Sequence, residues 1–160
     1  MPALTPSAGG APEGTWAPFQ PVRSRRVAIG FAVAQAVVLL GLAVIAPGNG
    51  PIPWQWYDRL GVVLLAAAIA YVLLLFARLR ATPGPDGLVV RNVVVVTKLE
   101  WAQIVAVRFG GGDPWVTLDL DDGNVLAVMA IQRSDGARGV AEARRLATLV
   151  AEHSRTPADD

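Results

Sequence analysis

The 160-residue chain contains no cysteine and only one histidine, and these two shortages exclude several kinds of chemistry. Without cysteine there is no disulfide, no thiolate nucleophile and no cysteine-ligated metal site. A catalytic triad of Ser134, His153 and a carboxylate fails on distance, because the serine and the histidine fall at opposite ends of one expected helix. We therefore expect no enzyme, no catalytic residue and no cofactor.

Two other sequence patterns give only weak support for a metal site or a phosphate site. Four aspartates could offer oxygen ligands to a hard cation, but their spacing matches no calcium loop, and turn chemistry explains Asp121 and Asp122. The run Gly110–Gly112 could present backbone N–H groups to a phosphate. No Lys-Ser/Thr pair and no helix follows this run, so we interpret it as a hairpin loop. The four aspartates are Asp113, Asp119, Asp121 and Asp122.

Charge is absent from two long apolar runs, Val27–Ala46 with 20 residues and Leu60–Ala77 with 18. At a rise of ~1.5 Å per residue, each helix would approach the ~30 Å hydrocarbon thickness of a bilayer. The sequence therefore predicts a membrane α-helical hairpin over residues 23–80, with a lipid bilayer as its partner. A positive cluster before an apolar run can also announce a signal peptide, and Val44-x-Ala46 would fit its cleavage site.

The residues that flank the two spans predict the topology. Trp54, Trp56 and Tyr57 lie in the short connection, where amphipathic rings fit the headgroup belt of a membrane. Arg59 is the one arginine in that connection. By the positive-inside rule, the five arginines outside the hairpin place both termini in the cytoplasm of a multi-pass cell-membrane protein. These five are Arg23, Arg25, Arg26, Arg78 and Arg80.

Small residues recur at helical spacing within the spans. They form the ridges Ala28-Ala32-Ala36, Gly30-Ala34 and Ala66-Ala70. Small residues at i, i+4 let helix backbones approach closely in lipid, either within the hairpin or between copies in a homo-oligomer. Gln35, the one amide in the spans, is expected to hydrogen-bond across the helices or to mark a pathway.

The remaining residues divide into two tails and one small domain. Residues 1–22, rich in proline and glycine, predict a disordered tail, and residues 155–160 a frayed one. Residues 82–154 are net acidic, which argues against nucleic acid as a partner. After a linker at Ala81–Gly87, five short β-branched runs separated by turn residues predict an antiparallel meander. These runs are Leu88–Arg91, Val93–Thr97, Ile104–Phe109, Val116–Leu120 and Val125–Met129.

A helix follows the strands and completes a small α+β domain. Ser134 or Asp135 is expected to cap it. Apolar residues then recur at helical spacing, so that Leu146 with Leu149 or Val150 should face the core. Arg144 and Arg145 should face water.

The pattern resembles a known family. The runs Gly112-Asp113-Pro114-Trp115 and Leu126-Ala127-Val128-Met129-Ala130-Ile131-Gln132, followed by a final helix, are similar to the bacterial pleckstrin-homology-like (PH-like) domain of the actinobacterial low-molecular-weight protein antigen family. That family also places two membrane spans before the domain. The resemblance implies a partly open β-barrel or two packed sheets capped by a C-terminal helix. It implies no catalytic residue, and Arg91 and Lys98 are too few cations for an inositol-phosphate cradle in the first hairpin.

Three functions remain open. The first is a membrane-anchored interaction (scaffold) module that offers a sheet edge or groove to a cytoplasmic protein, with Arg144 and Arg145 as the candidate partner face. The second is a reader of anionic lipid head groups at the inner leaflet, aided by Arg78 and Arg80. The third is an accessory subunit of a transporter or channel, which the lack of charge inside the spans disfavours.

Overall fold

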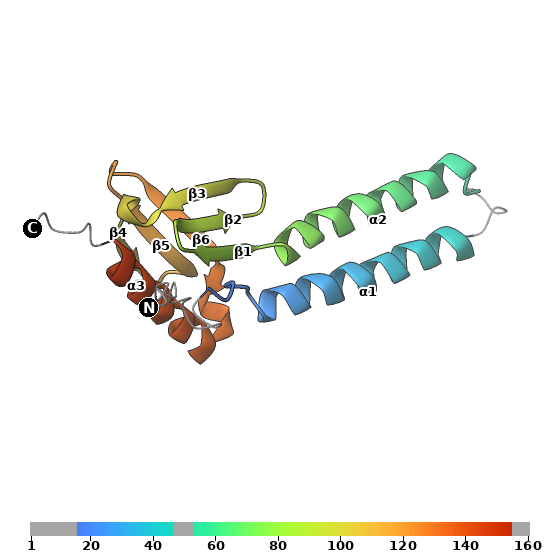
Figure 1. Ribbon diagram of the computed structural model, residues 1–160. Coiled ribbons are helices and arrows are strands. Elements are labelled where there is room, and N and C mark those ends of the chain that lie inside the picture. The colour runs from blue at the N-terminus through green and yellow to red at the C-terminus, as the bar shows by residue number, and fades with distance from the viewer. Residues whose placement is uncertain (1–15, 47–52, 155–160) are drawn as a thin grey trace, which may run out of the picture.

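The computed structural model describes residues 16–46 and 53–154, and these form a helical hairpin joined to a small domain (Figure 1). Helix α1 (Arg23–Ile45) and helix α2 (Trp56–Ala77) lie antiparallel and side by side. The predictions made for residues 1–15, 47–52 and 155–160 fall outside the described residues.

Both helices are long and apolar enough to cross a membrane. Only 17% of the most apolar window of α1 and 6% of that of α2 are buried inside the protein, so neither is the core helix of a soluble fold. Their contact face is made of small residues, with Ala28, Ala32 and Ala43 buried on α1 and Ala66 buried on α2. The Gly30-Ala34 ridge stays exposed. The hairpin therefore uses the first alanine ridge for packing between its own two helices.

Hydrogen bonds from two polar side chains, Gln35 and Arg59, join α1 and α2. The Gln35 side-chain amide donates 3.2 Å hydrogen bonds to the carbonyls of Ala66 and Ala32, which confirms its expected role across the helices. The guanidinium of Arg59 donates to the carbonyls of Ala43 and Ala46 at 2.8 and 2.9 Å. These carbonyls lie in the last turn of α1 and would otherwise lack partners.

The domain consists of two three-stranded antiparallel sheets and one helix. In one sheet the order is β1 (Arg80–Gly84), β2 (Gly87–Arg91) and β3 (Val96–Glu100). In the other it is β4 (Ile104–Arg108), β5 (Trp115–Leu120) and β6 (Val125–Gln132). Short 3-10 turns at Trp101–Gln103 and Arg133–Asp135 precede β4 and helix α3 (Ala137–His153). The sheets pack on each other without closing into a barrel.

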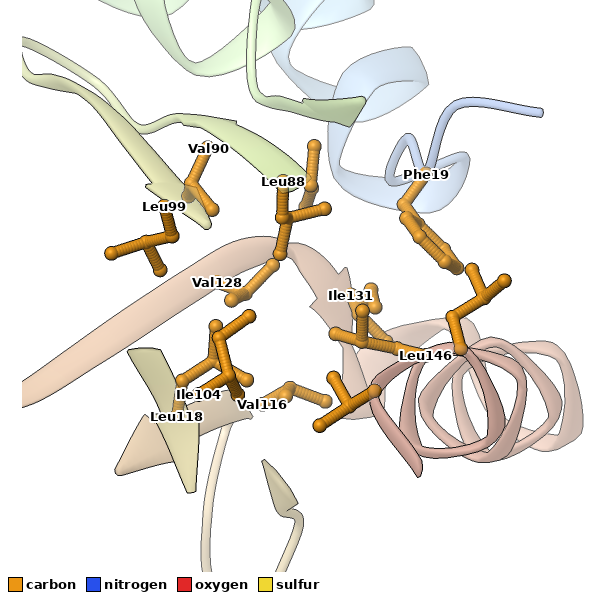
Figure 2. Close-up of a cluster of buried hydrophobic side chains, with 14 of the residues drawn as sticks. Phe19, Leu88, Val90, Leu99, Ile104, Val116, Leu118, Val128, Ile131 and Leu146 are labelled. Carbon is orange, nitrogen blue, oxygen red and sulfur yellow. The ribbon is translucent and has the colours of Figure 1, made fainter. Parts of the chain in front are cut away.

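The core lies between the two sheets and beneath α3 (Figure 2). Leu88 and Val90 of the first sheet face the buried side chains of the second sheet, including Val116 and Val128. Leu146, Leu149 and Val150 of α3 are buried, as the sequence predicts.

The sequence prediction was wrong about one missed strand and about strand ends, since β3 and β6 each end three residues later than predicted. Residues 81–84, expected to be linker, belong to β1, so the described domain has six strands and a boundary at Thr82 would cut the first of them. β3 begins at Val96 rather than Val93. The Asn92 N–H donates to the Val95 carbonyl at 2.9 Å, which turns the chain before the strand can start.

The start of the chain also differs from the expectation. Within the predicted tail, residues 16–22, called here the N-terminal segment, pack on the domain. The Phe19 ring is only 1% exposed and lies in the core beside Leu146 (Figure 2). Its backbone exchanges hydrogen bonds of 2.8 and 3.1 Å with Ala81, at the outer edge of β1. The prediction of disorder is therefore wrong for this segment, because a buried aromatic ring and backbone pairing hold it.

Candidate functional site

The structure brings most of the flanking arginines to one end of the hairpin. α1 begins and α2 ends beside the domain, so arginines more than fifty residues apart in sequence become neighbours (Figure 1). Arg25, Arg78 and Arg80 line one cavity of about 460 Å³, which we call the junction pocket. The other lining residues are Gln20, Ala77, Leu79, Thr82, Val89 and Arg91.

The junction pocket concentrates positive charge. Four of its nine lining residues are arginines and none is acidic. Within residues 16–46 and 53–154, the ion pairs are Arg108–Asp119 and Arg145–Glu142, so no pocket arginine has a carboxylate partner there. The pocket therefore offers several guanidinium donors to an anion.

Arg80 and Arg91 are the most informative pair in this pocket. They are direct cross-strand partners in the β1–β2 register, and both are exposed. Like charges placed directly opposite each other destabilise a sheet. An anion between them would remove this repulsion, so the pair costs stability when the pocket is empty and favours a bound anion.

Arg91 is the pocket arginine that the sequence analysis did not place among the residues flanking the spans. The signal was present in the stretch from Arg80 to Arg91, where Pro85 and Asp86 can form a two-residue turn. Once residues 80–84 are taken as a strand, antiparallel pairing around this turn sets the two arginines opposite each other. Lys98, the other cation of the first hairpin, lines a different cavity.

The remaining cations at the junction have other contacts. The Arg23 guanidinium donates a 3.2 Å hydrogen bond to the carbonyl of Ser134. Arg26 lines a second cavity together with Arg25 and Arg138. The predicted flanking arginines thus form a basic collar where α1 and α2 meet the domain.

The aromatic residues of the connection lie at the opposite end of the hairpin. Trp56 and Tyr57 are 73% and 56% exposed, and their ring centroids are 5.9 Å apart. Trp54 is half-buried and lines a cavity with Tyr57 at the start of α2. Arginines at one end and exposed aromatic rings at the other match the two interfaces expected of a membrane hairpin.

Arg144 and Arg145, the predicted partner face of α3, lie in different surroundings. Arg144 is exposed, as expected. Arg145 is half-buried: its guanidinium donates a 2.7 Å hydrogen bond to the Ala17 carbonyl and lies 3.9 Å from the centre of the Phe19 ring. Arg145 therefore holds the N-terminal segment, because that segment covers the side of α3 that was expected to face water.

The aspartates considered as metal ligands make hydrogen bonds within turns and one ion pair. Asp113 accepts a 2.8 Å hydrogen bond from the Gly110 N–H, and Asp119 pairs with Arg108. Backbone and side-chain hydrogen bonds from Asn124 lower the pKa of Asp122 from its ordinary value. Among the described residues there is no group of three His, Cys, Asp or Glu side chains that could hold a metal ion.

The chain is similar to a known domain family and to two mycobacterial proteins. The bacterial PH domain family matches residues 77–148, which cover β1 to most of α3. The chain is 35% identical over 126 residues to uncharacterized protein Rv1417 of Mycobacterium tuberculosis and equally to uncharacterized protein Mb1452 of Mycobacterium bovis. The alignment covers 79% of this chain and 81% of each relative.

This chain belongs to the family of these mycobacterial proteins, and its domain is a bacterial PH domain. No solved structure matches it. The PH-like prediction is therefore confirmed at the level of the domain. The resemblance to the low-molecular-weight protein antigen family stays a prediction, because neither the matched domain family nor the mycobacterial relatives carry that name.

Proposed function

We propose that this protein is a two-span cell-membrane protein whose bacterial PH domain binds the phosphate of an anionic lipid head group in the junction pocket, on the cytoplasmic side. PH domains are non-catalytic modules, so the function is binding. The opposed pair Arg80–Arg91, together with Arg25 and Arg78 and with no acidic residue in the lining, is the observation that carries this proposal.

The position of the pocket supports a lipid as the ligand. The apolar part of α1 starts at Val27, two residues after Arg25, and the apolar part of α2 ends at Ala77, directly before Arg78. In a membrane these boundaries fall at the headgroup level, where lipid phosphates lie. Each arginine near an anionic surface contributes about 1 kcal/mol of attraction.

Orientation follows from the same residues. The collar gathers its arginines at one end of the hairpin, whereas Arg59 at the other end is engaged with α1 carbonyls. Both termini then belong in the cytoplasm, and the pocket faces the inner leaflet, which carries the anionic lipids.

The test is lipid binding by the full chain. The protein in mild detergent is titrated with dioctanoyl phosphatidylglycerol or dioctanoyl phosphatidylcholine, and bound lipids are counted by native mass spectrometry. The double variant Arg80→Gln/Arg91→Gln should lose the preference for phosphatidylglycerol. The variant Lys98→Gln/Arg144→Gln removes the same charge from exposed positions outside the pocket and should keep it.

Two results would contradict this proposal. If both double variants lost the preference equally, net charge rather than the pocket would attract the lipid. If inorganic phosphate bound to the pocket and phosphatidylglycerol did not, the ligand would be a free phosphate anion.

A scaffold function is the second candidate, supported by one edge of the first sheet. β3 pairs with β2 on one side, and within the described chain no strand pairs with its other side. An extended peptide can add to such an edge through backbone hydrogen bonds. Pull-down of the intact protein from native membranes, repeated with Lys98→Pro to block the edge, tests this candidate, because the Lys98 N–H points away from β2 in this register and proline removes that backbone donor.

A further inference from the structure

The turn between β2 and β3 carries an apolar surface that the lipid pocket does not explain. Residues 93–96 are four consecutive valines, which we call the valine tip. Val94 is 85% exposed, more than any large hydrophobic side chain described in α1 or α2, where the highest value is 81% at Ile45. Val95 and Val96 are 62% and 50% exposed. Hairpin turns ordinarily carry glycine, asparagine or aspartate, so four valines here need a reason beyond turn formation.

Hydrogen bonds of Asn92, the residue directly before the valine tip, hold the tip in place. The Asn92 side-chain amide donates a 2.8 Å hydrogen bond to the Ala127 carbonyl on β6, and its oxygen accepts one of 3.3 Å from the Met129 N–H. The Asn92 N–H closes the turn onto the Val95 carbonyl. These bonds tie the tip to the second sheet, so the valines project outward instead of folding back onto the core.

Strand register fixes the direction in which the tip projects. Arg91 lies opposite Arg80, which follows the end of α2 by three residues, and the tip continues beyond Arg91. Figure 1 shows the β2–β3 turn on the side of the domain that faces the helices, next to the end of α2. At ~3.3 Å per residue, the tip reaches roughly 3–7 Å past the level of Arg80. The headgroup layer of one leaflet is of comparable depth, roughly 5–8 Å.

We propose that the valine tip inserts into the bilayer that α1 and α2 cross, at the boundary between head groups and acyl chains of the leaflet nearest the domain. Exposed apolar side chains at the level where the spans leave the membrane fit a lipid surface. The tip then forms a third membrane contact beside the two helices and fixes the tilt of the domain against the bilayer. This inference rests on membrane insertion of the hairpin and is independent of an occupied junction pocket.

The natural chain contains no cysteine, so one substitution gives one labelling site. Val94→Cys carries an environment-sensitive fluorophore in the full chain, reconstituted at low density into phosphatidylcholine liposomes. Val125→Cys is the matched control, since Val125 is 57% exposed and begins β6 at the other hairpin turn. Val38→Cys, 67% exposed in the middle of α1, reports insertion of the hairpin.

The labels at positions 94 and 38 should show blue-shifted emission, quenching by lipids spin-labelled on the acyl chain, and little quenching by aqueous iodide. The label at position 125 should show the reverse. Equal iodide quenching at positions 94 and 125 would overturn the proposal, as would an unprotected label at position 38. Protection at position 94 that appeared only when several copies shared a liposome would also overturn it, because a second copy of the chain would then cover the tip.

Discussion

The Asp135 carboxylate accepts a 2.8 Å hydrogen bond from the backbone N–H of Arg23, 112 residues earlier in the sequence. Its second oxygen accepts a 3.1 Å bond from the N–H of Val22. Asp135 thus caps the start of α1 from the turn before α3, although the sequence suggested that it would cap α3. An acidic group at a helix N-terminus satisfies free N–H groups and complements the helix dipole. This contact couples the hairpin directly to the PH domain.

Replacing Asp135 with alanine should loosen that coupling. Loss of a capping carboxylate costs about 1 kcal/mol. In the full chain in detergent micelles, the amides of Val22 and Arg23 should exchange hydrogen faster, while the amides of the core strands keep their protection. Asp121→Ala is the control, because Asp121 is an exposed turn residue at a distance from α1. Unchanged exchange at both amides in Asp135→Ala would contradict the capping role.

Arg144 and Arg145 should respond differently to the same substitution. Arg145→Ala removes a charged hydrogen bond to Ala17 and a cation–π contact with Phe19, which together are expected to cost about 2 kcal/mol of unfolding free energy. Arg144→Ala alters an exposed side chain and should stay within about 0.5 kcal/mol. Chemical denaturation of the full chain measures both. Equal stabilities would mean that the N-terminal segment does not depend on Arg145.

Phe19 should behave as a core residue. Phe19→Ala creates a cavity between β1 and α3 and is expected to cost about 3–5 kcal/mol. Phe31→Ala makes the same chemical change on α1, where the ring is 62% exposed and faces outward. Its effect on unfolding of the domain should be small. Thermal melts followed by near-ultraviolet circular dichroism distinguish the two variants, and a domain indifferent to Phe19→Ala would contradict the packing of the N-terminal segment.

Gly139 should not tolerate a methyl group, although it lies within a helix. A Cβ built at this position would meet the Gln132 carbonyl oxygen at 2.1 Å, because α3 passes close to the end of β6. Helix propensity favours alanine over glycine by about 1 kcal/mol. Steric crowding is expected to outweigh this gain and to give a net loss of about 1–3 kcal/mol. Gly139→Ala that raised the melting temperature of the full chain would show that α3 can move away from β6.

The sequence predicts what depends on local pattern. Apolar run length identifies the two helices, alternation identifies β5, and helical spacing places Leu146 in the core. β1 escapes prediction because Pro83, Gly84 and Pro85 resemble a linker. Its edge position makes proline acceptable there, and that position is a tertiary property.

The same limit applies to the N-terminal segment and to the junction pocket. Nothing in the composition around Phe19 indicates that its ring enters a core more than sixty residues further along the chain. Likewise, Arg25, Arg78 and Arg91 come from α1, the end of α2 and β2, so only the folded arrangement makes them one site. Asp135 could be recognised as a capping residue, but the helix that it caps could not.

The topology of the hairpin is open to a direct test. The collar of arginines beside the domain, with Trp56 and Tyr57 at the opposite end, predicts that the domain is cytoplasmic and that residues 47–57 lie outside. A membrane-impermeant maleimide should label Asn49→Cys on intact cells. It should label Ser154→Cys only after the membrane is permeabilised. Because the chain has no cysteine of its own, any label reports the introduced position.

The reverse labelling pattern would place the junction pocket at the outer leaflet and contradict a role at the cytoplasmic face. Labelling of both positions on intact cells would mean that α1 and α2 do not form a closed hairpin across the bilayer.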